Sequence, residues 1–142
     1  GFEIPVGASN VHGITTEKAL AEGAELVDIL DEFSAWEDRC NVVIGHNVSF
    51  DISVIGAEYW RMYGRNPFEG KRTVDTMKSS TNFCQIPGGY NGKFKWPKLN
   101  ELYRKLFDAD MGAAHTALQD IENTTTCYFE LVKRGVINEP NP

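Results

Sequence analysis

Hydrophobic and polar positions along the chain predict a fold in which strands alternate with helices. The apolar run from Val42 to Ile44 is too short for a helix, and Asn41 and Gly45 bound it. This is typical of a central strand covered on both faces of a parallel sheet. After a polar turn, apolar residues recur at helical spacing as far as Gly64. Because ligands bind beyond the carboxyl ends of parallel strands, the turn and the residues after it are the expected site.

The rest of the pattern predicts four more helices, one more strand and two irregular segments. A short helix is expected between an N-cap at Thr15 or Thr16 and a stop at Gly23. Further helices are expected at residues 24–36, 98–107 and 117–134, and a second strand at residues 72–76. Residues 2–13 and 81–97 are rich in turn formers, so we expect an irregular first segment and an exposed loop. Asp75, at the end of the second strand, is expected to cap the next turn, with metal binding as the alternative.

Length and composition favour one domain, residues 1–142, in a reducing compartment such as the cytoplasm. The chain has 142 residues with 42% hydrophobic content, enough for one core. Its three cysteines, Cys40, Cys84 and Cys127, are far apart and lack metal-ligand spacing. No apolar run is long enough to span a membrane and no leader pattern is visible, so no membrane partner is expected.

The charge is unevenly distributed along the chain. The formal net charge is −6, yet residues 61–105 hold ten basic and three acidic side chains, a net of about +7. Seven aromatic residues are interleaved there, a mixture suited to phosphate contact and base stacking. The alternative interpretation is a solvated basic surface with aromatic residues in the core.

A second informative stretch lies at the start of the last helix. Thr116 followed three residues later by Gln119 has the form of a capping box. His115 and Asp120 then occupy the two positions that meet in a hydrophobic staple, so an imidazole and a carboxylate are expected at one spot. The alternative is a polar substitute for the staple without chemistry.

Three ordered motifs give the chain a resemblance to the DnaQ-like (DEDDh) 3′–5′ exonucleases, the epsilon proofreading subunits and their relatives. The segment GHNVSFD, with Asp51, resembles the second exonuclease motif, and HTALQD, with His115 and Asp120, resembles the third. The segment IPVGASNVHGIT is similar to the stretch before the family's first crossover helix. There, His12, Gly13 and Ile14 would border the terminal nucleotide. The implied fold is α/β and ribonuclease-H-like.

The resemblance implies hydrolysis of phosphodiester bonds at the 3′ end of DNA with two Mg²⁺ or Mn²⁺ ions. Asp51 and Asp120 would be metal ligands, and His115 would be the general base. Asn47 and Phe50 would hold the sugar and stack on the terminal base. Single-stranded DNA or a DNA 3′ end is the implied substrate, and a DNA polymerase subunit is a further candidate partner.

One departure from the family pattern changes these expectations. The family's first motif, an Asp-x-Glu pair on a central strand, has no counterpart ahead of the IPVGASNVHGIT segment. We therefore expect an N-terminally truncated fold without its first three strands, and little or no nuclease activity from this chain alone. We also expect an unpaired edge on the strand at residues 42–44 that favours self-association. Two alternatives stay open: a non-catalytic module that binds nucleic acid or a polymerase, and an RNA-directed nuclease.

Overall fold

The computed structural model of the chain describes residues 3–112 and 116–138. The chain divides into two compact units, residues 1–39 and residues 40–142, and we describe each unit by itself. No helix in the described ranges is long and apolar enough to cross a bilayer.

The first unit contains three helices, α1 (Val6–His12), α2 (Thr16–Glu22) and α3 (Leu26–Glu37). The second and third confirm the predicted helices, and the Thr15 hydroxyl caps α2 by accepting a hydrogen bond from the Lys18 amide at 3.2 Å. The expectation of an irregular segment at residues 2–13 was wrong for α1. Pro5 precedes the helix, and Gly13 follows it in the left-handed conformation. Both residue types mark helix ends, but they add nothing to an apolar periodicity.

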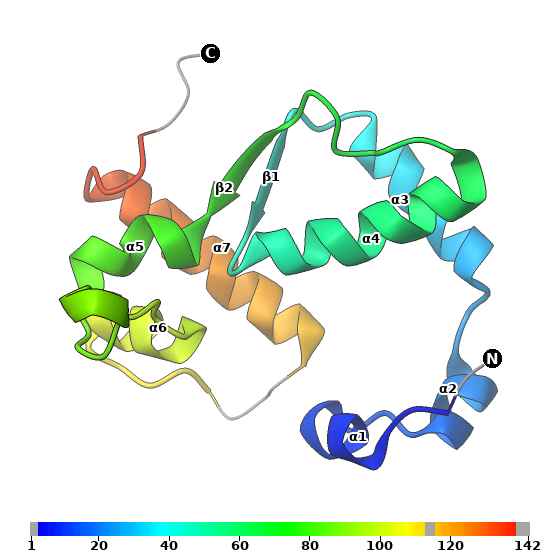
Figure 1. The fold of residues 1–142 in the computed structure, drawn as a ribbon, viewed down its shortest axis with the longest axis horizontal. Coiled ribbons are helices and arrows are strands. Elements are labelled where there is room, and N and C mark those ends of the chain that lie inside the picture. The colour runs from blue at the N-terminus through cyan, green and yellow to red at the C-terminus, as the bar shows by residue number, and fades with distance from the viewer. Residues whose placement is uncertain (1–2, 113–115, 139–142) are drawn as a thin grey trace. The chain divides into compact units, whose positions relative to one another are not determined.

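The second unit is built on two parallel strands, β1 (Val42–Gly45) and β2 (Arg72–Asp75). In the register, Val42 lies opposite Arg72 and Gly45 lies opposite Asp75, so both strands end at the same edge. Figure 1 shows the strands side by side, with α4 (Val48–Tyr63) starting at the end of β1. The predicted strands and the helix ending at Gly64 are confirmed. Within the described part of the chain, β1 has a strand on one side only.

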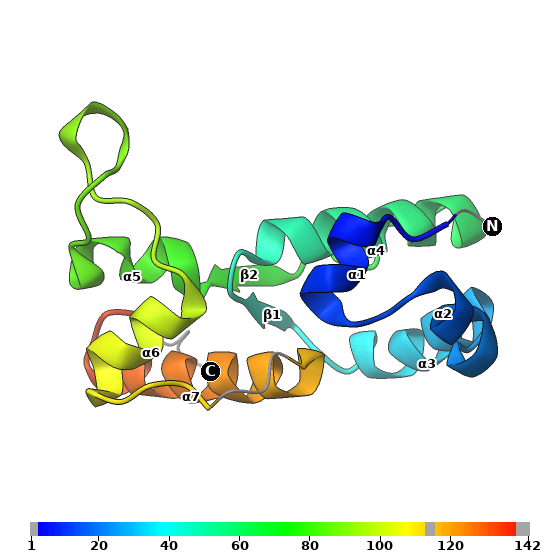
Figure 2. The ribbon, with the colours of Figure 1, turned by 90° about the horizontal axis from the view of Figure 1, so that it is seen from below.

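Helices cover the two strands on both sides. Figure 2 shows α4 on one side of the strands and α7 (Ala117–Lys133) on the other. The helix α6 (Leu99–Phe107) packs against α7, and both confirm predicted helices. A continuous core joins β2, α5, α6 and α7 and contains these buried residues: Val74, Cys84, Leu102, Leu106, Cys127, Tyr128, Leu131 and Ile137. The β1 strand itself is only half buried, less covered than its apolar run predicts.

The helix α5 (Thr76–Cys84) was not predicted, and it occupies the start of the segment expected to be an exposed loop. Its buried face carries Thr76, Met77, Ser80 and Cys84. The Ser80 hydroxyl donates to the Thr76 carbonyl at 2.6 Å. Because this bond satisfies the hydroxyl inside the helix, a small polar residue can lie in the core. The exposed loop therefore begins at Gln85, and it contains one 3-10 turn, η1 (Tyr90–Gly92).

Candidate functional site

The turn between β1 and α4 has a tightly constrained backbone. A side chain at Gly45 would place its Cβ 2.8 Å from the Cβ of Val48, closer than carbon atoms can pack. Asn47 follows in the left-handed conformation, with φ of 66°, which asparagine tolerates better than most residues. This geometry sends the chain from the strand directly into the first turn of α4.

Asp75 connects this turn to the end of β2. Its Oδ1 accepts hydrogen bonds from the backbone amides of Asn47 and Met77, both at 3.0 Å, and of Lys78 at 3.4 Å. The predicted capping role is confirmed, because the last two amides belong to the first turn of α5. The bond to Asn47 was not predicted. One carboxylate oxygen thus holds the start of α5 and the turn before α4 together.

His46 fixes the same turn from another direction. Its Nε2 lies 3.0 Å from the carbonyl oxygen of Pro97, and its Nδ1 lies 3.0 Å from the Thr76 hydroxyl. Since a carbonyl only accepts, Nε2 carries the proton in the neutral ring. The Thr76 hydroxyl also lies 3.1 Å from the Gly45 carbonyl. Burial lowers the pKa of His46, and the Pro97 hydrogen bond and the charge of Asp75 oppose that shift.

Phe50 and Asp51 lie in the first turn of α4, immediately after the constrained turn. Both side chains are exposed, and Phe50 is 66% exposed despite its large apolar ring. Within the described residues, the Asp51 carboxylate has no hydrogen bond or ion pair. It is therefore available to an ion or a ligand, and the exposed ring beside it is available for stacking.

Asp120 lies in the first turn of α7, and its carboxylate is also exposed and uncommitted among the described residues. The Thr116 hydroxyl caps this helix by accepting from the Gln119 amide at 3.2 Å, as predicted. The Gln119 side chain donates instead to Glu122, at 3.2 Å, so the reciprocal half of the box is not seen. His115 lies outside the described residues, and its approach to Asp120 stays a prediction.

The helices α4 and α7 both contact β1. In Figure 1, β1 and β2 run toward the end of the unit at which α4 begins, and the N-terminal part of α7 lies toward that end as well. These contacts do not fix the separation of the Asp51 and Asp120 carboxylates, so their convergence stays a prediction. Among residues 3–112 and 116–138, no three His, Cys, Asp or Glu side chains group as a metal cage.

The remaining predicted site residues, His12, Gly13 and Ile14, belong to the first unit. His12 ends α1, and its Nδ1 accepts a hydrogen bond from the Ile14 amide at 3.1 Å. Gly13 is the left-handed residue that follows the helix, with φ of 72°. Ile14 is exposed, and its contact with the terminal nucleotide stays a prediction. Their position relative to Asp51 stays a prediction.

Comparison with known families decides what kind of domain contains this turn. A family model described as Exonuclease matches residues 2–128, which is most of the chain. The chain belongs to the exonuclease family. The resemblance to DnaQ-like exonucleases is thereby confirmed, and so is the ribonuclease-H-like α/β fold, with helices packed around a small parallel sheet.

Curated relatives of this exonuclease-family chain are much longer proteins. The chain is 27% identical over 127 residues to the DNA polymerase III PolC-type of Staphylococcus aureus, with the same values for strains MW2 and USA300. The alignment covers 87% of this chain and 8% of each relative. The chain therefore corresponds to a small part of these polymerases.

Sequence reasoning missed three residues of the candidate site: His46, Thr76 and Lys78. Lys78 donates from Nζ to the Ser49 hydroxyl at 2.8 Å, and its Nζ lies 3.5 Å from Oδ2 of Asp75. One signal was present in the sequence. Both strands were predicted, and each is followed immediately by polar residues, which parallel strands bring to one edge.

Proposed function

We propose that this chain forms part of a metal-dependent 3′–5′ exonuclease that hydrolyses phosphodiester bonds at the 3′ end of DNA. The observation that carries the proposal is the uncommitted, exposed carboxylate of Asp51 on a turn that Asp75 and His46 hold rigid. The family match supports hydrolysis, and the polymerase name of the relatives supports DNA as the substrate.

The donor chemistry suits a hard divalent cation. Asp51 and Asp120 offer oxygen ligands that no described cation neutralises, and magnesium commonly binds through one or two carboxylates together with substrate phosphates. The absence of a three-ligand cage in the described ranges is compatible with that mode of binding. Asp51 and Asp120 would thus hold Mg²⁺ or Mn²⁺, which when bound activates the attacking water and stabilises the leaving 3′ oxygen.

The other side chains would position the substrate and move its protons. His115 takes the proton of the attacking water at an imidazole nitrogen, because an imidazole titrates near neutral pH. The exposed ring of Phe50 stacks on the terminal base, and Asn47 holds the sugar. His12, Gly13 and Ile14 border the terminal nucleotide. Asp75 and His46 keep Asn47, Phe50 and Asp51 in one arrangement while the substrate binds.

Hydrolysis of a 5′-labelled single-stranded oligonucleotide by the full-length protein in Mg²⁺ tests this function. We expect products that shorten one nucleotide at a time, and a 3′-terminal phosphorothioate linkage that slows the first step. The Asp51→Asn and Asp120→Asn variants should lose about 100-fold or more of the rate, because each removes charge from the metal site. Asp28→Asn is the matched control, since Asp28 is an exposed carboxylate in the first turn of α3.

Several results would contradict the proposal. If Asp51→Asn is as active as Asp28→Asn, Asp51 is not a metal ligand of the active site. Preference for a matched RNA oligomer would favour the RNA-directed nuclease, and tight binding without hydrolysis would favour the non-catalytic module. The low activity expected of the 142-residue chain alone stays a prediction, which an assay beside the full-length protein tests.

Association with a DNA polymerase is a separate part of the proposal. Its support is the name of the relatives, in which the matched region is 8% of a DNA polymerase III PolC-type. We expect the natural full-length chain either to contain a polymerase or to co-purify with one. Purification of the endogenous protein, followed by a primer-extension assay, tests this association.

A further inference from the structure

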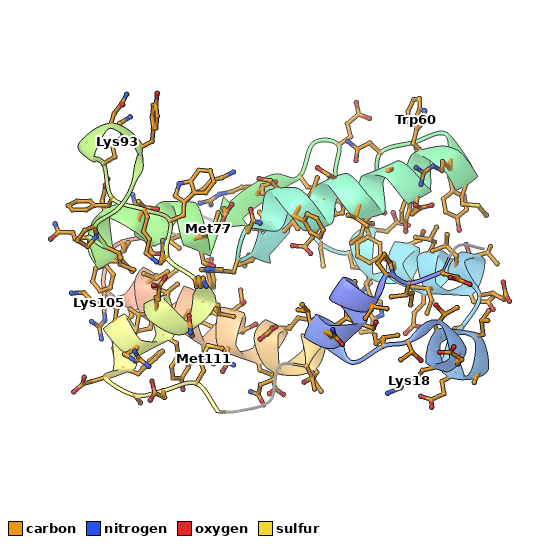
Figure 3. The ribbon with its side chains drawn as sticks, turned by 60° about the horizontal axis from the view of Figure 1, so that its bottom comes forward. Lys18, Trp60, Met77, Lys93, Lys105 and Met111 are labelled. Atoms are coloured by element: carbon orange, nitrogen blue, oxygen red, sulfur yellow. The ribbon has the colours of Figure 1, made fainter. Side chains whose placement is uncertain are left out.

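A groove in the second unit lies between α5 and the loop that follows it. It has a volume of about 470 Å³, and Thr81 and Asn82 of α5 line it together with Gly92, Lys93, Phe94 and Trp96 of the loop. Figure 3 shows Lys93 on the loop, which extends outward from α5. The groove is therefore open to solvent and has one polar wall and one basic, aromatic wall.

The charge of this region is opposite to that of the chain as a whole. Residues 76–98 contain four lysines, Lys78, Lys93, Lys95 and Lys98, and no arginine or acidic residue, whereas the whole chain carries −6. Two of these lysines have acidic partners: Lys78 Nζ lies 3.5 Å from Oδ2 of Asp75, and Lys95 Nζ lies 2.6 Å from Oε1 of Glu101. Lys93 has no ion-pair partner among the described residues. A concentrated positive charge on an acidic protein favours a polyanion at this position.

The aromatic side chains of the loop face solvent and not the core. Trp96 is 60% exposed and Tyr90 is 86% exposed, and Phe94 is partly exposed between them in sequence. By contrast, Phe68, Phe83 and Tyr103 of the same basic region are largely covered. Tyr63, at the end of α4, is also exposed, so this loop carries three of the four exposed aromatic residues within residues 61–105. Exposed aromatic rings beside lysines are the usual elements of a single-strand binding surface.

The loop is held in a defined shape before any ligand binds. The Lys95 amide donates to the Ile86 carbonyl at 2.9 Å, which closes the loop. At Gly89 the backbone lies close to residues 93 and 94 of the same loop. A Cβ at this position would lie 2.4 Å from the carbonyl oxygens of Lys93 and Phe94. Only glycine permits this close approach. The exposed rings are therefore displayed on a preorganised surface, which lowers the entropic cost of binding.

Two contacts connect the groove to the proposed active site. The Lys78 ammonium lies 5.9 Å from the centre of the Trp96 ring and donates to the Ser49 hydroxyl at 2.8 Å. Ser49 is two residues before Asp51 in the first turn of α4. Pro97, next to Trp96, accepts the hydrogen bond from His46 Nε2 at 3.0 Å. Trp96 is thus anchored beside the turn that carries Asn47, Phe50 and Asp51.

We propose that this groove binds the nucleotides of a single DNA strand that precede the 3′-terminal nucleotide. Trp96 stacks on a base, and Lys93 neutralises a phosphate beside it, while Lys78 stays paired with Asp75 and holds Ser49. The inference rests on the proposed function, because it assigns the terminal nucleotide to the region of Phe50 and Asp51. It predicts that the enzyme recognises several nucleotides and not the terminal one alone.

Photocrosslinking with the full-length protein tests the location of the strand. Single-stranded oligonucleotides carry 5-iododeoxyuridine at the terminal, second, third or fourth position from the 3′ end, and irradiation is done in EDTA so that no hydrolysis occurs. We expect the second to fourth positions to crosslink to the peptide containing residues 90–96. Crosslinks from these positions only to other peptides would overturn the proposal.

Binding and kinetic measurements on variants test the contribution of Trp96 and Lys93. Trp96→Ala should weaken oligonucleotide binding about tenfold, and Trp96→Phe should recover part of the loss, because stacking needs an aromatic face. Trp60→Ala is the matched control, since Trp60 is 66% exposed and lies well away from Lys93 in Figure 3. Lys93→Gln should reduce the slope of log affinity against log salt by about 0.7, the value for one phosphate of a single strand.

A minimal substrate separates failure of this inference from failure of the proposed function. The p-nitrophenyl ester of thymidine 5′-monophosphate occupies the terminal site alone. Trp96→Ala should therefore raise the KM for an oligonucleotide by a larger factor than the KM for this ester, whereas Trp60→Ala should change neither. If neither substrate is hydrolysed but the crosslinks appear at residues 90–96, the exonuclease proposal is contradicted and the proposal that the groove binds a DNA strand is supported. If both are hydrolysed and Trp96→Ala matches Trp60→Ala in DNA binding, the groove proposal fails. That result would favour a protein partner as the ligand of the exposed aromatic loop.

Discussion

The Oδ1 atom of Asp75 lies 3.0 Å from the backbone nitrogen of Asn47, although 27 residues separate the two in the chain. The same oxygen caps α5 through the Met77 amide. The Asp75 side chain is largely buried. Its Oδ2 has no hydrogen-bond partner among the described residues and lies 3.5 Å from the Lys78 ammonium. This carboxylate couples the folding of the sheet edge to the shape of the candidate site.

Replacement of Asp75 by alanine should destabilise the protein by about 2 kcal/mol, because it removes a helix cap and leaves the Asn47 amide without its acceptor. Asp75→Asn should cost less, since an amide oxygen can still accept these bonds. Urea unfolding measures the effect. Thr116→Ala is the matched control, because Thr116 caps α7 through one exposed bond, and it should cost about 1 kcal/mol or less. Equal losses for Asp75→Ala and Thr116→Ala would contradict a coupling role for Asp75.

His46 should make stability depend on pH. Burial lowers its pKa in the folded protein from the ordinary value of 6.5. As the pH falls, His46 is therefore protonated in the unfolded chain at a higher pH than in the folded chain. The stabilisation is fully present above about pH 6.5 and is lost as the pH falls through the folded pKa, by at most about 1.4 kcal/mol per pH unit. Urea unfolding from pH 8 to pH 5 should show a steeper loss for wild type than for His46→Gln. His12→Gln, which changes an exposed ring, should behave as wild type.

The three cysteines should differ in reactivity. All three are free thiols; Cys84 and Cys127 are buried, and Cys40 is exposed. Burial raises the pKa of Cys127 to about 12 and raises the pKa of Cys84 as well, so neither forms the reactive thiolate at neutral pH. Iodoacetamide at pH 8 should modify Cys40 first, and the other two only after unfolding, as followed by peptide mass mapping. Modification of Cys127 at the rate of Cys40 in native protein would show that this core opens readily.

The unpaired edge of β1 should promote self-association of the 142-residue chain. Within the described residues β1 pairs with β2 alone, and Ile44 on it is 40% exposed. A lysine on an edge strand opposes strand pairing between molecules, so Ile44→Lys should lower the association. Val54→Lys, an exposed apolar position on α4, should not. Light scattering over a range of concentrations measures the mass, and a wild-type chain that stays monomeric throughout would contradict the prediction.

Much of the second unit could be predicted from the sequence because its signals are local. The run from Val42 to Ile44, the stop at Gly64 and the cap at Thr116 each depend on residues within one turn of the feature they mark. The helix α5 lacked such a signal, since its buried face uses Thr76 and Ser80 in place of aliphatic residues. Its polar groups are satisfied by bonds inside the helix, which a hydrophobic pattern does not register.

The candidate site was predicted only in part, because its support is not local. Asp51 and Phe50 could be placed after a strand from the sequence, and the structure puts them on an exposed first turn. The hydrogen bonds of Asp75 to Asn47 and of His46 to Pro97 join segments 28 and 51 positions apart in residue number. Such contacts depend on the pairing of the two strands and on the path of the loop, and no sequence period encodes them.

The close approach of the chain to itself at Gly89 divides the loop into a tip and a base. The tip contains the 3-10 turn Tyr90–Gly92, and the base ends at Pro97, whose carbonyl accepts the hydrogen bond from His46. Under the proposed function, a change at the tip should therefore alter how a strand binds, while the turn that carries Asp51 keeps its hydrogen bonds.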